Sequence, residues 1–478
     1  MRAPCLIGWA QVARHEGEPL DAWAEALEAT GVPADAIDSL DVLHCQSWPY
    51  DDPAGRLASR VGAAPGQRAY AGIGGTTPLE ALFGAARRIA AGESSVCAVV
   101  GGEQLARVRA FRKAGERPPW SHRDPAKKPF PFEAPFHPAE VAHQVFQAYS
   151  TFALRDVARR AHRGLGVDEH RGVLGELFAP MTAVAAGNPY AWFPVARTAP
   201  ELTSPGPDNR MVAFPYTKRL VAVMDVDLSA AVVLASAEAA DRLGVAREDR
   251  VHLRGWASAQ DPVHVAEHDE LWRSPGMGRA LAGALDGAGV GVDDLAHADL
   301  YSCFPSSVLF ALDALGLGPD APHAPFTVTG GLPYAGGPGS GYALLSLAAM
   351  AGRLRADGGG AGLVTGVGMH MTKHAAAVLS TSPGEASAPV ADPGPAVLRP
   401  IVDVHHGFAT VAAYTVHHGR DGVPTDALLV CDVDGGARCY ATASDALFLT
   451  DLEADEWVGR DVVLADGGEG VNLLVGAP

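Results

Sequence analysis

A glycine-rich stretch, Thr329 to Tyr342, limits the folds open to this chain more than any other feature. Six of its fourteen residues are glycines, which let the backbone take up positive φ angles and approach a ligand closely. The run at 343–354 is rich in alanine and leucine and has no polar face, so we expect a helix buried on all sides, followed by an apolar strand at 361–367. The free amides at the start of that helix favour a phosphate or a developing oxyanion.

The same order of loop, helix and strand occurs earlier in the chain. A glycine-rich turn at 72–77 precedes an expected helix at 78–91, with Thr77 as its N-cap and Glu80 completing a capping box, and an apolar strand at 96–100 follows. Two such copies predict a duplicated α/β half. A glycine-rich turn before a helix is also common where backbone only packs closely, so either loop alone is a weak signal.

Composition excludes several classes of protein. The chain has 478 residues, 48% of them hydrophobic, which is enough for two or three folded domains. Its net charge of −18 argues against binding nucleic acid or anionic membranes. No apolar run reaches the length of a membrane helix and no signal peptide is recognisable, so we expect a soluble, cytoplasmic protein. Six scattered cysteines indicate free thiols, and His370 and His374 lack a third ligand in register, so we expect no metal.

Changes of pattern along the chain suggest its domains. We expect a first half at 1–245 with a lid-like insertion at about 104–212, and a second half at 246–385. A linker rich in proline and small residues at 386–400 then leads to a tail at 401–478. The strand pattern of the tail predicts a small β-barrel of the oligonucleotide-binding (OB) type, but its lack of lysine argues against nucleic acid.

A basic island lies in the insertion. Eight Lys or Arg residues and only two acids occur between Arg107 and Lys128. This composition favours a lid whose cations meet ligand phosphates, with Arg123, Lys127 and Lys128 as the expected contacts. A solvated loop is the equal alternative.

The sequence Tyr301-Ser302-Cys303-Phe304, together with Gly336-Gly337-Pro338-Gly339 and the duplicated halves, resembles the thiolase superfamily. The likeness is closest to the sterol-carrier-protein-type thiolases and, with the extra β domain, to the thiolase-like proteins type 1. It implies a duplicated five-layer αβαβα fold with an added C-terminal OB-like barrel, as a monomer or homodimer. It also implies an acyl-CoA or similar acyl thioester as ligand, with coenzyme A as substrate carrier and no other cofactor.

Three positions depart from the thiolase pattern. Gly75 stands where thiolases carry the nucleophilic cysteine, Gly337 stands in place of the histidine, and Thr365 corresponds to a second cysteine. The sterol-carrier-type branch has a His-Asp-Cys-Phe loop, of which Cys303 is the one surviving proton-transfer group. Loss of the thiol and the imidazole removes the usual acyl-enzyme route.

Without the thiolase cysteine and histidine, the sequence predicts a site built from glycine loops and from the helix starts after Thr77, Phe304 and Ser340. We expect these three helix starts to face one cavity. A related steroid-degrading aldolase group also carries a tyrosine at the position of Tyr301, which implies proton transfer by that residue. Cys303 precedes a helix, whose field can lower its pKa, and a buried, inert cysteine is the equal alternative. The expected catalytic residues are Cys303, Tyr301 and His374, and the expected substrate-binding residues are Gly75, Thr76, Ser302, Gly330, Gly331, Tyr334, Gly337 and Gly339.

Three functions fit this reading. The first is acyl transfer or carbon–carbon bond chemistry on an acyl-CoA without an acyl-enzyme. The second is a retro-aldolase that cleaves a β-hydroxyacyl-CoA with Tyr301. The third is a non-catalytic CoA-binding or scaffold protein, which the missing nucleophile favours.

Overall fold

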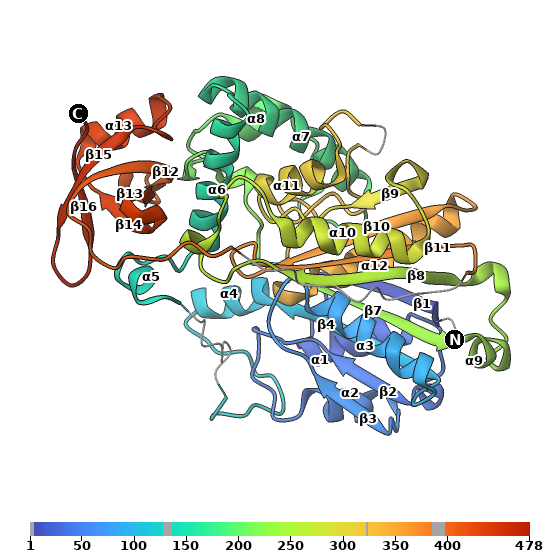
Figure 1. Cartoon of the computed structure of the whole chain (residues 1–478). Helices are drawn as coiled ribbons and strands as arrows, with labels where there is room; N and C mark the ends of the chain where they lie inside the picture. The colour runs from blue at the N-terminus through green and yellow to red at the C-terminus, as the bar shows by residue number, and fades with distance from the viewer. Residues whose placement is uncertain (1–3, 128–135, 322–323, 385–396) are drawn as a thin grey trace.

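The computed structural model describes residues 4–127, 136–321, 324–384 and 397–478 (Figure 1). The first half comprises β1 (Pro4–Ala13), α1 (Pro19–Glu28), β2 (Ser39–Val42), α2 (Pro53–Val61), β3 (Gln67–Tyr70), α3 (Thr77–Ala91), β4 (Val96–Gln104), β7 (Asp227–Ser236) and α9 (Ala237–Arg242). The second half comprises β8 (Val251–Gln260), α10 (Pro275–Ala288), β9 (Leu295–Asp299), α11 (Pro305–Leu315), α12 (Tyr342–Ala356), β10 (Ala361–Gly368) and β11 (Lys373–Ser380).

The two halves repeat one sheet topology, which confirms the duplication. The strand order is β3-β2-β4-β7-β1-β8-β11-β10-β9, so that β2-β4-β7-β1 in the first half matches β9-β10-β11-β8 in the second. In each half the first pair is parallel and the next two pairs are antiparallel. The halves join where β1 pairs with β8 through Cys5 and Leu6.

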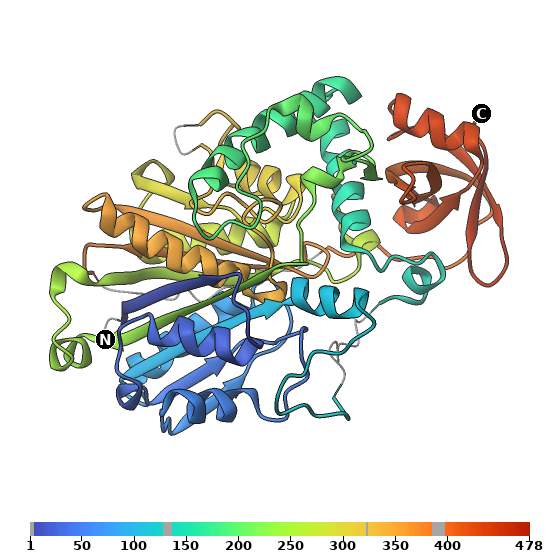
Figure 2. The same cartoon turned by 180° about the vertical axis from the view of Figure 1, so that it is seen from behind.

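Helices α3 and α12 form the central layer of the five (Figures 1 and 2). Each contacts strands of both halves, α3 through β4 and β10 and α12 through β7 and β10. Helices α1 and α2 cover the outer face of the first half, and α10 with α11 covers the outer face of the second. The apolar run that predicted a fully buried helix is α12, whose first seven residues are all buried. The predicted five-layer αβαβα fold is therefore confirmed.

The insertion between β4 and β7 is mostly helical. It contains α4 (Leu105–Lys113), α5 (Pro138–Ala142), α6 (Ala148–His162), α7 (Val167–Gly187) and α8 (Ala199–Thr203). The insertion thus begins with a helix. Residues 220–224 are apolar but form no strand, because their backbone bonds to loops instead: Ala222 N donates to Cys303 O and Gly337 N donates to Val223 O.

The tail forms a closed five-stranded barrel, as predicted, while its OB type stays a prediction. Strands β13 (Pro424–Asp432), β14 (Arg438–Ala443), β16 (Asn472–Gly476), β15 (Asp461–Asp466) and β12 (Gly407–His418) follow one another, and β12 pairs with β13 to close it. The sequence did not predict β16 or α13 (Ala446–Ala454). Strand β12 also pairs with β5 (Met211–Ala213) of the insertion, so the barrel continues into the body. The predicted linker lies largely outside the described residues.

No helix in the described ranges is both long and apolar enough to span a bilayer. In the same part of the chain no three His, Cys, Asp or Glu side chains group together as a metal site would require.

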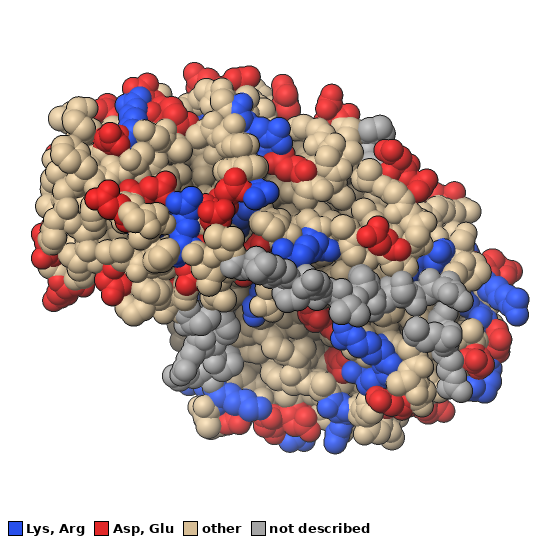
Figure 3. Space-filling view, in the orientation of Figure 1, with Lys and Arg blue, Asp and Glu red and all other residues tan. Residues whose placement is uncertain are grey.

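On the face shown in Figure 3, acidic and basic side chains are interspersed, and the coloured atoms form no broad basic field.

Candidate active site

A cavity of about 390 Å³ opens where the two halves and the insertion meet. Its walls carry no Lys, Arg, His, Asp or Glu from the described residues, so its polar groups are two tyrosines, two glutamines, a serine, a thiol and backbone. The lining residues are Gln46, Ile73, Gly74, Gly75, Gln147, Ala148, Tyr149, Phe152, Val221, Ala222, Met224, Tyr301, Cys303, Phe304, Leu332, Gly337, Gly339, Ser340, Val367, Gly368 and Met369.

The starts of α3, α11 and α12 converge on this cavity, as predicted. Gly75, Phe304 and Ser340, which lie just before these helices, all line it. The capping box expected at Thr77 is wrong, because Thr76 occupies the cap position of α3 and its side chain makes no capping bond. The cap of α12 is Gly341, which has no side chain to offer. Neither helix start thus has a side-chain cap, but in α3 Thr77 N already donates to Gly74 O and Pro78 has no N–H. These two helix starts therefore favour a partial negative charge in the cavity through their helix dipoles.

The start of α11 is held differently. The Tyr216 hydroxyl, from β6 (Tyr216–Thr217) in the insertion, accepts a hydrogen bond from Ser306 N at 3.3 Å. The same hydroxyl donates to Asp156 Oδ2 at 2.6 Å. Since one amide of α11 is already bonded, this helix start positions the loop before it more than it offers donors to a ligand.

Gly75 and Tyr301 share one space. A Cβ atom at Gly75 would lie 2.5 Å from the Tyr301 hydroxyl oxygen and 2.1 Å from Val367 O. Any side chain there would collide with both, so position 75 accepts only glycine while Tyr301 keeps its place. The phenol of Tyr301 thus fills the place that the resemblance assigns to the thiolase nucleophile.

Tyr301 is fixed by its backbone and ring rather than by its hydroxyl. Its N–H donates to Thr365 Oγ1 at 2.8 Å, and the Ser307 hydroxyl donates to its carbonyl. Its ring packs edge-on against Tyr342, with centroids 5.5 Å apart. Within the described chain the hydroxyl has no hydrogen-bond partner, and burial, followed by the nearby Cys303 thiol, raises its pKa far above the usual range. At neutral pH Tyr301 therefore presents a neutral O–H to the cavity.

The Cys303 thiol also lines the cavity, but it is not activated. Burial raises its pKa to about 12, against the smaller opposing effects of a hydrogen bond to Ser307 and of backbone amides. Desolvation thus outweighs the helix field, which favours the alternative of a buried, inert cysteine, while the expected catalytic role of Cys303 stays a prediction.

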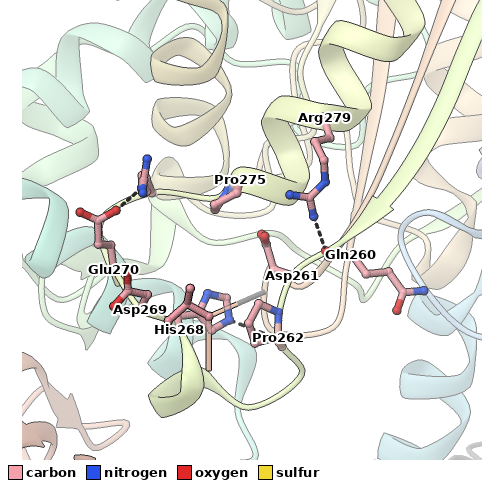
Figure 4. Close-up of a pocket in the computed structure, with 10 residues that line it drawn as sticks. Gln260, Asp261, Pro262, His268, Asp269, Glu270, Pro275 and Arg279 are labelled. Atoms are coloured by element: carbon pink, nitrogen blue, oxygen red, sulfur yellow. Dashed lines mark hydrogen bonds and ion pairs between the residues drawn. The ribbon is translucent and has the colours of Figure 1, made fainter. Parts of the chain in front are cut away.

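His374 does not reach the cavity. Its Nε2 lies 3.0 Å from Asp261 Oδ2 and 3.1 Å from Ser274 Oγ, and burial lowers its pKa, so the ring is neutral. Asp261 lines a separate cavity of about 180 Å³ between the end of β8 and the start of α10 (Figure 4). His374 thus supports the start of α10, whose cap is Ser274, and its expected catalytic role stays a prediction without a contact to the cavity.

Of the expected substrate-binding residues, Gly75, Gly337 and Gly339 line the cavity, and the others stand behind it. Ser302 Oγ accepts a hydrogen bond from Leu332 N at 3.1 Å, which fixes the loop that carries Leu332 into the cavity. The Tyr334 ring packs against Phe178 at 6.3 Å, and its buried hydroxyl has no partner within the described ranges. The residues that do not line the cavity are Thr76, Ser302, Gly330, Gly331 and Tyr334.

The described part of the basic island, 107–127, does not supply cations to the walls of the cavity. The Arg123 guanidinium lies 5.8 Å from the ring centroid of Trp48. Lys127 Nζ donates to the carbonyls of Tyr50, at 3.1 Å, and Asp51, at 2.6 Å. Lys128 lies outside the described residues, so the phosphate role of this island stays a prediction.

Sequence reasoning missed the walls that come from loops and from the insertion. Gln147, Tyr149 and Phe152 come from the start of α6, and Gln46 from the loop after β2. Met369 sits at a positive φ of 53° in the turn between β10 and β11. The one feature of the sequence that could have pointed to the α6 residues is the pair of aromatic residues, Tyr149 and Phe152, at the start of a helix that follows a proline-rich segment.

Comparisons with known proteins identify the family. A scan against protein-family models gives no match, and a search of curated proteins gives none either. Among solved structures, a monomeric SCP2-thiolase-like protein type 1 from Mycobacterium smegmatis is 30% identical, with a TM-score of 0.87 over 100% of this chain and 99% of that one.

Two more distant structures share the fold. Human mitochondrial 3-ketoacyl-CoA thiolase is 16% identical, with a TM-score of 0.58 over 80% of this chain and 99% of its own. The Ltp2–ChsH2(DUF35) aldolase is 17% identical, with a TM-score of 0.59 over 78% of this chain and 97% of its own. The chain therefore belongs to the SCP2-thiolase-like proteins of the thiolase superfamily.

Proposed function

We propose that this protein binds an acyl-CoA or similar thioester in the cavity and catalyses carbon–carbon bond chemistry on it without an acyl-enzyme. The single observation that carries the proposal is the position of Tyr301. Its neutral hydroxyl lies beside Gly75, in the space that the resemblance assigns to the nucleophilic cysteine of thiolases. A proton donor, the Tyr301 hydroxyl, thus lies where a thiolase would carry the thiolate of its cysteine. Coenzyme A is the substrate carrier, and the proposal requires no other cofactor.

The surrounding groups suit a thioester whose carbonyl oxygen gains negative charge. The starts of α3 and α12, neither of which has a side-chain cap, favour that charge through their helix dipoles, each start contributing typically about 0.3–1 kcal/mol. The cavity walls in the described chain hold no thiolate and no imidazole that could attack the carbonyl carbon. Such a site stabilises an enolate better than it forms an acyl-enzyme.

Cleavage of a β-hydroxyacyl-CoA fits these groups best. The bond between the α and β carbons breaks, the β-hydroxyl loses its proton as a carbonyl forms, and the electron pair passes into the thioester enolate. The Tyr301 oxygen takes up the β-hydroxyl proton in the same step in which its own proton passes to the α carbon, so that no free phenolate is needed. One proton thus moves from oxygen to carbon, and Tyr301 ends in its neutral form.

The test is a panel of CoA thioesters, with acetoacetyl-CoA, saturated acyl-CoAs and β-hydroxyacyl-CoAs of several lengths, read by mass spectrometry of products and of intact protein. We expect cleavage of a β-hydroxyacyl-CoA, no covalent adduct and no thiolysis of acetoacetyl-CoA. An acyl adduct on the protein, or thiolysis at about 1 per second or more, would overturn the proposal. Tight binding of CoA compounds with no turnover would instead identify a non-catalytic CoA-binding protein.

A further inference from the structure

Helix α6 joins the cavity to the C-terminal barrel. Its first turn supplies Tyr149 and Phe152 to the cavity wall. Arg160 lies in the last turn of α6. Its guanidinium donates to the Tyr414 hydroxyl of β12 at 2.9 Å and pairs with Glu456 at 3.0 Å. One helix thus contacts both the ligand space and the barrel.

A barrel residue also contacts the end of α6 that lies at the cavity. His417, on β12, places Nε2 2.8 Å from Ser150 Oγ and Nδ1 2.7 Å from Asp426 Oδ2 on β13. Because a carboxylate only accepts, Nδ1 carries the proton, and in the neutral ring Nε2 then accepts from the Ser150 hydroxyl. The imidazole is therefore held by the barrel on one side and holds buried Ser150 on the other.

The neighbouring cavity residue is also within reach of the barrel. The Tyr149 ring meets the His417 ring edge-on, with centroids 6.1 Å apart. Burial raises the pKa of Tyr149, the charge of Asp426 raises it further, and Arg210 opposes them. Both the packing and the electrostatic surroundings of Tyr149 thus depend on strands β12 and β13.

We propose that His417, braced by Asp426, is a positioning residue that holds the first turn of α6 and sets Tyr149 against the ligand. The barrel then helps to position a residue of the cavity wall. That Tyr149 meets a CoA thioester rests on the proposed function, whereas the hold on α6 does not.

The test uses three variants of His417 in the full-length chain. His417→Gln places an amide near Nε2 and can still accept from Ser150, whereas His417→Asn reaches only toward Asp426, and His417→Ala reaches neither. His406→Ala is the matched control, because His406 is exposed and contacts no other group in the described chain through a hydrogen bond. Amide hydrogen exchange at 148–152 reports the hold on α6, and the Kd for a CoA thioester reports the cavity.

We expect the Asn and Ala variants to exchange about three- to tenfold faster at 148–152 and to bind the thioester weaker by a similar factor, as the loss of one hydrogen bond implies. The Gln variant and the His406 control should stay near wild type. Unchanged exchange in His417→Ala, or a Gln variant as impaired as the Ala variant, would overturn the proposal. If the wild-type chain binds no CoA compound, the proposed function is wrong. The amide exchange data would then still decide whether His417 holds the first turn of α6.

Discussion

Replacing Gly75 by alanine tests the space that it shares with Tyr301. The added Cβ would lie 2.1 Å from Val367 O, 2.5 Å from the Tyr301 hydroxyl oxygen and 2.7 Å from Tyr301 Cζ, where ordinary contacts begin at 3.4 Å. The tyrosine ring can move, but Val367 O belongs to strand β10 and cannot. We therefore expect Gly75→Ala to destabilise the fold by about 1–3 kcal/mol, as overpacking in a core does.

The assay is urea unfolding followed by tryptophan fluorescence, with the change in free energy taken from the midpoint and the slope. Gly72→Ala is the control, because a Cβ at Gly72 meets nothing within 4 Å. Adding Tyr301→Ala to Gly75→Ala removes two of the three collisions, so the pair should be non-additive by about 0.5–3 kcal/mol. Equal stability of the two glycine variants, or full additivity in the double variant, would refute the reasoning.

Three further outcomes follow from the site. Because the pKa of Cys303 is about 12, its alkylation rate should rise about tenfold per pH unit from pH 7 to 11, and a CoA thioester should protect it more than Cys431; a plateau near pH 9 would show an ordinary thiol. Glu103 of β4 accepts hydrogen bonds from N of the cavity residue Gln46 at 2.7 Å and from Ser47 N at 2.8 Å. Burial raises the pKa of Glu103 to about 6, so its contribution to stability should be lost, by about 2 kcal/mol, as pH rises from 4.5 to above 6, and Glu103→Gln should abolish that component; an equal slope in both proteins would contradict it. Reversing Lys127 and Lys128 to glutamate should weaken CoA binding in a salt-dependent way, and unchanged affinity at low salt would remove the phosphate role from the basic island.

The sequence predicted what depends on local pattern. The glycine loops before α3 and α12 and the buried character of α12 were readable because glycine content and apolar runs are properties of neighbouring residues. The convergence of three helix starts then followed from the duplicated fold. The barrel strands were readable for the same local reason, whereas β16 was not, because its alternation is short and follows a glycine-rich turn.

The sequence could not predict contacts between distant segments. Nothing local to Gly75 shows that Tyr301 fills its space, and nothing near His374 shows that Asp261 and Ser274 hold it away from the cavity. The two alternatives for Cys303, an activated and an inert thiol, could not be separated because a helix start is visible in sequence and the depth of burial is not. The same limit hid the wall from α6 and its contact with His417.

The central claim is that Tyr301 donates a proton to the α carbon, and deuterium incorporation tests it most directly. A β-hydroxyacyl-CoA that the wild-type protein cleaves would be turned over in D₂O, and the acyl-CoA product examined by mass spectrometry. The account predicts one deuterium at the α carbon with the wild type, and loss of turnover by at least about a hundredfold in Tyr301→Phe, with Kd changed by less than threefold. Turnover and incorporation that persist in Tyr301→Phe, or an acyl group found on Cys303, would contradict it.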